Sequence, residues 1–194
     1  NLVPPVVLKI DTLTDTGDGV LTEAESTNAS IQKFLITWNE DMFNPTGDSQ
    51  AADVTNPANY MLLQPGANGT YQSSTCGTIS GDDQAVVINS VTYANRVATV
   101  TVNNSNTLSG GTYRLTLCDT LQDVDGSRLD GNRDGQPGGN YLRNFSTDPL
   151  QTGALINVTT TQDINDGLCT SSNCSLREAV RQANVSASPV TIHV

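Results

Sequence analysis

The sequence predicts a mainly β protein, with a β-sandwich over residues 1–150 and a short strand–loop–helix–strand unit over residues 151–194. Three observations predict this class: short apolar segments recur along the chain, turn-forming residues separate them, and a helical pattern occurs only near the end. In Val97–Val102 and Tyr113–Leu117, apolar and polar residues alternate, so each strand should bury one face. A chain of 194 residues is long enough for one large or two modest domains.

At least six short strands are expected in the first unit. They are Val6–Ile10, a mixed segment containing Ile31, Phe34, Ile36 and Trp38, then Asn59–Leu63, Ala85–Ile88, Val97–Val102 and Thr112–Cys118. Turn signals separate them at Gly66, Gly69, Gly81–Asp82 and Gly110–Gly111. Regularly spaced short strands without a long helical pattern favour two packed sheets.

A short amphipathic helix is predicted near the end of the chain. Ser175 and Glu178 form a capping box, in which each side chain accepts a hydrogen bond from a backbone N–H of the first turn. The apolar stripe behind this cap consists of Leu176, Ala179, Val180 and Ala183. About nine helical residues are too few to be stable alone in water, so the stripe must pack on something. A strand over Val190–Val194 follows, and we expect its partner downstream, which makes the chain a fragment of a longer protein.

The same region resembles a known family. A strand at Leu155–Val158, an acidic turn around Asp163, Asn165 and Asp166–Gly167, two close cysteines, and the run Cys174–Ala179 followed by Ala183–Asn184 are similar to the CSLREA domain. The resemblance covers residues 154–194. That family precedes right-handed parallel β-helices in bacterial secreted and surface proteins, so the resemblance implies the N-terminal cap of a truncated β-helix, without catalytic residues. The alternative is an ordinary amphipathic helix after a disulfide loop.

A second resemblance covers residues 6–148. The segments Phe34–Pro45, Asn56–Leu62, Leu108–Leu117 and Leu121–Gly131 look like the bacterial Ig-like domain that is repeated in surface-layer and adhesion proteins. Trp38 stands where that family commonly has Phe, and Ser127 where it usually has Asn. The resemblance implies an Ig-like β-sandwich with a structural role, which spaces other domains and in some members binds ligands.

The charge of the chain limits its partners. The sequence has 20 acidic and 9 basic residues, a net charge of −11 and a pI of about 4.1. Nucleic acid is therefore not an expected partner, because its phosphates require a basic surface. A cation such as calcium suits the charge better. No apolar run approaches the roughly 20 residues that span a bilayer, so membrane insertion is not expected either.

The chain contains four cysteines, which predict an oxidising compartment and a secreted or cell-surface protein. Three pairings are possible. We favour Cys76–Cys118 and Cys169–Cys174, because each pair then lies within one predicted unit. Zinc is not expected, since His193 is the only histidine.

An acidic segment between residues 119 and 135 predicts a calcium site. Its candidate ligands are Asp123, Asp125, Asp130, Asn132 and Asp134. The last three, with Gly135, match the first six positions of an EF-type loop, in which alternate residues direct oxygens inward. Tyr141 stands where a bidentate Glu is usual, so further oxygens would come from Asp119, the backbone or water. The alternative is a solvated acidic turn, whose Asp and Gly residues suit tight turns.

Two further acidic regions are predicted to be connections. The loop from Asp11 to Glu23 matches no complete metal template, and we favour a strand connection over a second ion site. The acidic residues near Cys169 are also predicted to form turns.

Catalysis has little support, because the single histidine leaves no Ser-His-Asp triad and the carboxylates lie in turn contexts. The sequence therefore predicts a non-catalytic, calcium-stabilised extracellular module that spaces and caps a larger surface or secreted β-helix protein. Its expected partners are the downstream β-helix, a surface polysaccharide or another surface protein, and a second copy through the C-terminal strand. The alternatives are an accessory carbohydrate-binding module of a polysaccharide-active β-helix enzyme, and a binding module that uses the sandwich loops.

Overall fold

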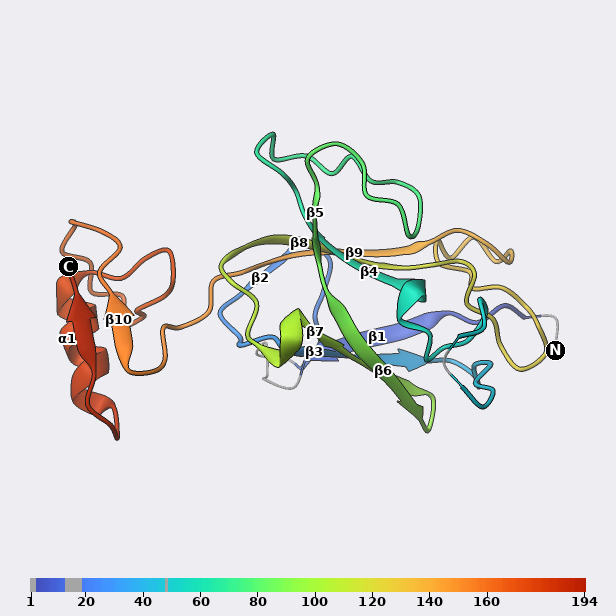
Figure 1. The fold of residues 1–194 in the computed structure, drawn as a ribbon, viewed down its shortest axis with the longest axis horizontal. Helices are drawn as coiled ribbons and strands as arrows, with labels where there is room; N and C mark the ends of the chain where they lie inside the picture. Colours follow the sequence, from blue (N-terminus) through green and yellow to red (C-terminus); the bar gives the residue numbers. More distant parts are fainter. Residues whose placement is uncertain (1–2, 13–18, 48) are drawn as a thin grey trace.

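A computed structural model describes residues 3–12, 19–47 and 49–194 (Figure 1). The strands are β1 (Val7–Thr12), β2 (Glu25–Thr27), β3 (Lys33–Trp38), β4 (Tyr60–Gln64), β5 (Gln84–Val86), β6 (Ile88–Ala94), β7 (Val97–Val102), β8 (Gly111–Leu117), β9 (Tyr141–Thr147), β10 (Leu155–Asn157) and β11 (Thr191–His193). The α-helix is α1 (Leu176–Val185), and the 3-10 turns are η1 (Pro57–Asn59) and η2 (Asn103–Ser105). The prediction of a mainly β protein is confirmed.

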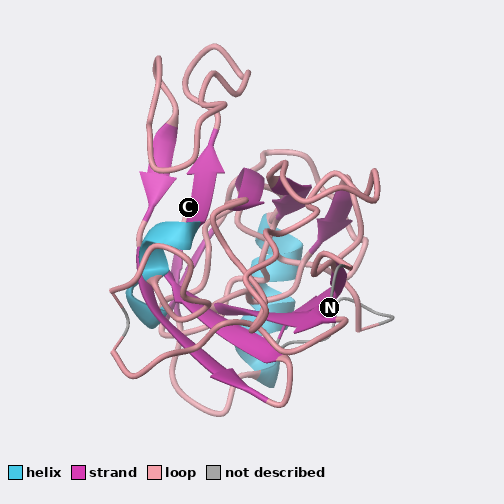
Figure 2. Ribbon diagram, turned by 90° about the vertical axis from the view of Figure 1, so that its right-hand side faces the viewer, coloured by secondary structure: helices cyan, strands magenta, loops and turns pink. Residues whose placement is uncertain are grey.

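Two larger sheets make up the body of the molecule. One has four strands in the order β1-β3-β7-β6, and the other has five in the order β2-β9-β8-β4-β5. Neighbouring strands are antiparallel except β2 and β9, which run parallel. Buried side chains of both sheets form one cluster, an arrangement that is compatible with the predicted sandwich. Figure 1 shows this body with the smaller C-terminal unit beside it, and in the end-on view of Figure 2 the C-terminal unit lies behind the body.

The centre of the sandwich core is aromatic. The Phe145 ring of β9 lies 5.7 Å from the Phe34 ring in an edge arrangement and 5.5 Å from the Tyr113 ring in a stacked one, measured between centroids. All three side chains are buried, and they come from both sheets. Alternation places Phe34 there, because β3 buries every second residue.

The outer face of the five-stranded sheet is also partly covered. Met61 and Leu63 of β4 alternate with core residues and therefore point away from the main core, yet they are only 8% and 0% exposed. The long β4–β5 loop, residues 65–83, lies against them, and Gly77 N lies 3.0 Å from the Met61 sulfur. In Figure 1 this loop rises from the sheet beside β5. It gives the outer face a small second layer.

The two predicted disulfide pairings are the ones in the structure. Cys76, in the β4–β5 loop, pairs with Cys118 at the end of β8, with Cα atoms 5.7 Å apart. Cys169 pairs with Cys174, with Cα atoms 4.3 Å apart. The first bridge ties the loop to the sheet that it covers, and the second closes a short loop before α1.

The strand predictions differ from the structure in three places. The segment Ala85–Ile88 is not one strand, because β5 ends at Val86 and β6 begins at Ile88 in the other sheet. The short strand β2 was not predicted. Strand β9 was not predicted either, because Arg143 occupies the position between its two buried aromatic residues and interrupts the alternation.

The C-terminal unit has a core of its own. Its strands β10 and β11 pair in parallel, and α1 connects and covers them. The buried cluster contains Ile156, Cys169, Cys174 and Ala179, with Val158, Val190 and Ile192 packed against it. A parallel pair of three-residue strands is too small to be stable alone, so the helix and the disulfide must support it.

The Cys76–Cys118 bridge should contribute strongly to the stability of the sandwich. It closes a loop over a sequence separation of 42 residues, and the loop-entropy model gives a stabilisation of about 4 kcal/mol for such a length. We expect the double variant Cys76→Ala/Cys118→Ala to lower the free energy of unfolding by about that amount in denaturant titrations. The matched variant Cys169→Ala/Cys174→Ala should leave the sandwich transition unchanged. Free thiols at residues 76 and 118 in the native protein, detected by mass mapping, would contradict this assignment.

Candidate functional site

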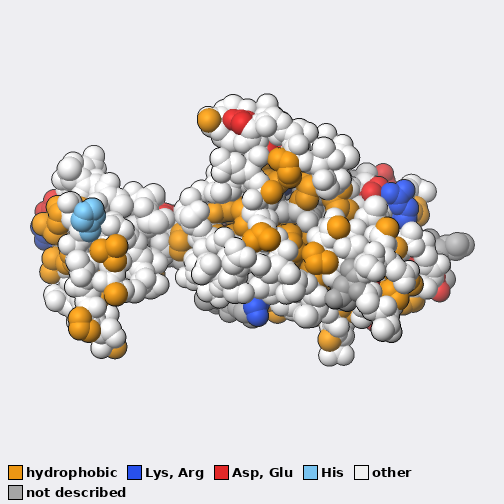
Figure 3. All heavy atoms as spheres, in the orientation of Figure 1, with side chains coloured by type: hydrophobic (Ala, Val, Ile, Leu, Met, Phe, Trp, Pro, Cys, Tyr) orange, Lys and Arg blue, Asp and Glu red, His pale blue; other side chains and the backbone are white. Residues whose placement is uncertain are grey.

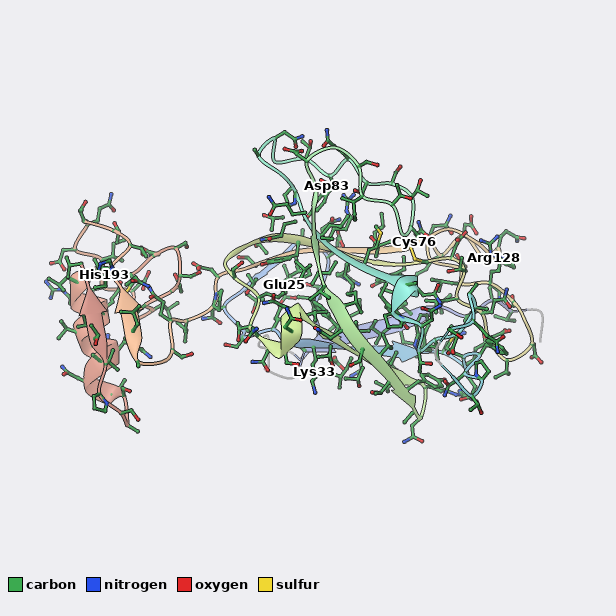
Figure 4. The ribbon with its side chains drawn as sticks, viewed as in Figure 1. Glu25, Lys33, Cys76, Asp83, Arg128 and His193 are labelled. Atoms are coloured by element: carbon green, nitrogen blue, oxygen red, sulfur yellow. A yellow bond between two sulfur atoms is a disulfide. The ribbon has the colours of Figure 1, made fainter. Side chains whose placement is uncertain are left out.

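The predicted calcium residues lie in two consecutive turns. In the first, the Asp123 Oδ1 atom accepts hydrogen bonds from the backbone N–H groups of Asp125 at 2.9 Å and Ser127 at 2.8 Å. Asp123 is fully buried, and its Oδ2 atom has no hydrogen-bond partner. Asp125 is exposed. Nearby, Arg128, which is labelled in Figure 4, pairs with Asp119 at 2.9 Å.

The second turn is the EF-like segment. The Asp130 carboxylate accepts backbone N–H groups from Asp134 at 3.1 Å and Gly135 at 2.8 Å. Asn132 donates its amide to Asp134 at 2.9 Å. Gly135 has a φ of +84°, so it makes the sharp turn expected of the sixth position. Asp130 is 3% exposed, whereas Asn132 and Asp134 are exposed.

These side chains organise the backbone of the segment. Asp123 and Asp130 each accept hydrogen bonds from two backbone N–H groups, as Asp residues do in tight turns. Within the described residues, no group of three or more His, Cys, Asp or Glu side chains is arranged to hold a metal ion. The calcium site therefore stays a prediction, and the buried, unpartnered Oδ2 of Asp123 is the feature that favours it.

The second acidic loop lies partly outside the described residues, which include Asp11 and Glu23 but not 13–18. Asp11 pairs with Lys9 of the same strand at 2.8 Å. Glu23 accepts hydrogen bonds from the backbone and side-chain amides of Asn144 in β9, at 3.0 and 2.6 Å. Glu23 thus has a structural role.

The best-defined polar centre of the C-terminal unit is Glu178. Its carboxylate accepts the backbone N–H of Ser175 at 3.1 Å and that of Asp166 at 3.0 Å, and it is only 2% exposed. Ser175 completes the capping box by accepting the N–H of Glu178 at 3.3 Å. The capping box was expected from sequence. The contact with Asp166, which holds the acidic turn against α1, was not.

The apolar stripe of α1 is only partly covered. Ala179 is buried, but Leu176 is 51% and Val180 is 43% exposed. Leu176 and Val180, together with Val158 and Val194, line an open groove of about 650 Å³. Its polar rim consists of Thr160, Thr161, Gln162, Asp163 and Arg177. Figure 3 shows hydrophobic side chains at the surface of this unit, near His193.

Polar contacts stabilise the rim of the groove. Arg177 donates its Nε to Asp163 at 2.7 Å and makes a second contact with the same carboxylate. The two side chains bridge the acidic turn and the first turn of α1. The groove therefore has a defined polar border beside an apolar floor.

The aromatic side chains and the single histidine lie outside the sites described above. Every Trp, Tyr and Phe residue lies in the described part of the chain, and none of these side chains is exposed. The ring of Tyr71, which is partly buried, lies under the Arg114 guanidinium at 4.0 Å. His193 lies on β11 in the C-terminal unit, far from the acidic segment (Figure 4).

Comparisons with known proteins identify no family. No protein-family model matches the chain, and neither curated proteins nor solved structures give a significant match. Among the described residues, no helix is long and apolar enough to cross a membrane. The site must therefore be interpreted from its own geometry.

The acidic segment gives a direct test for calcium. If the ion binds only the folded protein, calcium should raise the melting temperature by mass action, and a chelator should reverse the rise. Asp130→Ala should remove most of the calcium response, because it removes the buried carboxylate at the first position of the EF-like segment. The control Asp163→Ala, which removes an exposed carboxylate from the C-terminal unit, should keep the response. Identical wild-type melting curves with calcium and with chelator would rule out a structural ion.

Glu178 makes the C-terminal unit sensitive to acid. The backbone hydrogen bond from Ser175 lowers the pKa of this carboxyl, and contacts with Asp166 add to the effect despite burial, which acts to raise it. A group with a lowered folded-state pKa stabilises the fold above its unfolded pKa of about 4.3 and loses that contribution as the pH falls through the folded value.

We therefore expect the protection of the α1 amides against exchange, measured relative to the intrinsic exchange rate at each pH, to fall below a pH of about 4. Glu178→Gln should weaken the helix at neutral pH and remove most of this pH dependence. Arg177→Ala is the control for the neighbouring Arg177–Asp163 ion pair. Because it leaves Glu178 in place, it should keep the acid sensitivity of α1. Equal acid sensitivity in wild type and Glu178→Gln would contradict the assignment.

Proposed function

We propose that the chain is a non-catalytic extracellular structural or adhesion module, in which the sandwich acts as a spacer and residues 151–194 cap a larger β-helix. The observation that carries the proposal is the open apolar groove on the C-terminal unit. Leu176 and Val180 lie on the helix face that should pack on a floor, yet about half of each side chain is exposed. A partner that covers the groove would remove this apolar surface from water.

The geometry also favours a particular kind of partner, namely the first coil of a parallel β-helix downstream. Strands β10 and β11 are already parallel, as the strands of such a coil are, and Val194 lies both at the end of β11 and in the lining of the groove. A following coil would therefore start beside the surface that it has to cover. The resemblance of residues 154–194 to the CSLREA domain leads to the same proposal.

Two further features support an extracellular location. Both cysteine pairs are bonded in the structure, and disulfides persist mainly in oxidising compartments. The acidic composition suits a calcium-stabilised surface protein. We propose that Asp123 and the segment beginning at Asp130 bind a calcium ion that stabilises the sandwich.

The exposed groove gives a test in the chain that ends at Val194. Without a covering coil, the groove should drive self-association through the C-terminal unit, so we expect a concentration-dependent dimer in sedimentation velocity. Leu176→Asp and Val180→Asp should each shift the protein to monomer, because a charge in the covered groove is costly.

The matched control is Leu142→Asp, which introduces the same charge at a side chain of the sandwich that is 47% exposed. This control should leave association unchanged. In a longer chain that continues past Val194 into a β-helix, the wild-type groove should instead be protected from amide exchange. A wild-type monomer with strongly protected amides throughout residues 176–194, without packing on another surface, would overturn the proposal.

A further inference from the structure

The junction between the sandwich and the C-terminal unit contains an acidic residue that the sequence analysis did not single out. Asp148 directly follows β9, and its backbone N–H donates to the Thr27 carbonyl of β2 at 2.9 Å. The main chain of Asp148 thus belongs to the edge of the five-stranded sheet. Its side chain points the other way along the chain, into the C-terminal unit.

The Asp148 carboxylate binds one loop of that unit with all of its hydrogen-bonding capacity. It accepts the hydroxyl of Thr170 at 2.7 Å, the hydroxyl of Ser171 at 2.8 Å and the backbone N–H of Ser172 at 3.0 Å. The Ser172 hydroxyl is a fourth donor. All of these groups lie between Cys169 and Cys174, so the disulfide restricts the loop that the carboxylate holds.

Backbone contacts align the same two segments. Ser171 N donates to the Pro149 carbonyl at 3.1 Å, and Gln151 N donates to the Cys169 carbonyl at 2.8 Å. The Gln151 side chain adds a bond to the Thr170 carbonyl at 2.8 Å. Residues 148–151 and the disulfide loop therefore run against each other as a short paired element.

Gly110, in the loop before β8, shows how closely the sandwich approaches this element. A Cβ atom at Gly110 would lie 2.5 Å from the Ser171 hydroxyl oxygen and 3.4 Å from the Asp148 Oδ1 atom. Any side chain here would therefore displace Ser171 from Asp148. The absence of a side chain allows the β7–β8 loop, the end of β9 and the disulfide loop to meet.

The charge state of Asp148 is consistent with this arrangement. Burial acts to raise the pKa of its carboxyl, but the hydrogen bonds from Ser172, Thr170 and Ser171 outweigh burial and lower it. The side chain is therefore ionised near neutral pH. Hydrogen bonds to an ionised acceptor are roughly twice as strong as those between neutral groups.

We propose that Asp148 is an interdomain latch, which holds the disulfide loop 169–174 so that the sandwich and the C-terminal unit move as one rigid body. The latch would fix the direction in which the C-terminal unit faces, relative to the long axis of the sandwich. This inference goes beyond the proposed function, because it concerns the joint and does not require that the groove cap a β-helix.

NMR relaxation of the backbone amide nitrogens tests the latch. The measurement uses the full chain at a concentration at which sedimentation velocity shows a monomer. In the wild type, amides of the sandwich and of residues 154–194 should report one rotational diffusion tensor. In Asp148→Ala, the correlation time of the C-terminal unit should fall by roughly two-fold, because a released unit tumbles as a much smaller particle. Asp163→Ala, which removes an exposed carboxylate of the C-terminal unit, should behave as wild type.

Two outcomes would overturn the latch: independent tumbling of the two units in the wild type, and joint tumbling in Asp148→Ala. Chemical shifts of Ile156 and Ala179 show whether the C-terminal core remains folded in the variant. If Asp148→Ala disrupts that core, the relaxation measurement is made on Thr170→Val instead. This variant removes one hydrogen-bond donor to Asp148 and leaves the carboxylate in place. Unchanged joint tumbling in that variant together with wild-type resistance of the joint to proteolysis would also overturn the proposal.

A double variant tests the role of Gly110. Gly110→Ala and Ser171→Ala should loosen the joint to the same extent, because both remove the hydrogen bond between Ser171 and Asp148. The combined variant should be no looser than either single variant, since Ser171→Ala also removes the oxygen that the new Cβ would strike. Additive loosening would show that Gly110 acts elsewhere and would contradict the proposed contact.

Discussion

The packing of Phe145 between Phe34 and Tyr113 is the contact on which the rest of the structure depends. It joins the two sheets at their centre, and it fixes the position and facing of β9. The same strand then continues directly into Asp148, which binds the C-terminal unit. Core packing of aromatic rings therefore determines where the joint between the two units lies. An error of one residue in the register of β9 would turn Phe145 outward and misplace Asp148 as well.

Buried or partly buried carboxylates organise the loops in a similar way at several places. Asp123 and Asp130 shape the acidic segment, Glu178 joins the acidic turn to α1, and Asp148 holds the disulfide loop. Each of these accepts hydrogen bonds from backbone N–H groups of its loop. The many acidic residues of the chain are therefore not only a solvated surface charge. Asp123 differs from these three because one of its buried oxygens has no partner, and this is the feature that favours the proposed cation at this turn.

The sequence predicted the features that depend on local pattern. Alternation located β7 and β8, a mixed apolar segment located β3, the capping box located α1, and the division of the chain located both disulfides. The prediction failed where tertiary contacts determine the structure. Arg143 interrupts the alternation of β9, and the chain passes from one sheet to the other between β5 and β6. For the candidate sites, the acidic turns were visible as Asp and Gly residues. The role of Asp148 was not, because its donors lie more than 20 residues away and are ordinary turn residues.

The C-terminal unit combines two surfaces with opposite requirements. Toward the sandwich it uses polar groups that are fully paired, so this interface is specific in direction and needs little apolar area. On α1 it leaves an apolar stripe that its own two short strands cannot cover. A polar, directional joint determines orientation, whereas an open apolar face provides binding energy for a partner without fixing its angle. These residues place both surfaces on adjoining parts of one small unit, as the proposed capping role would require.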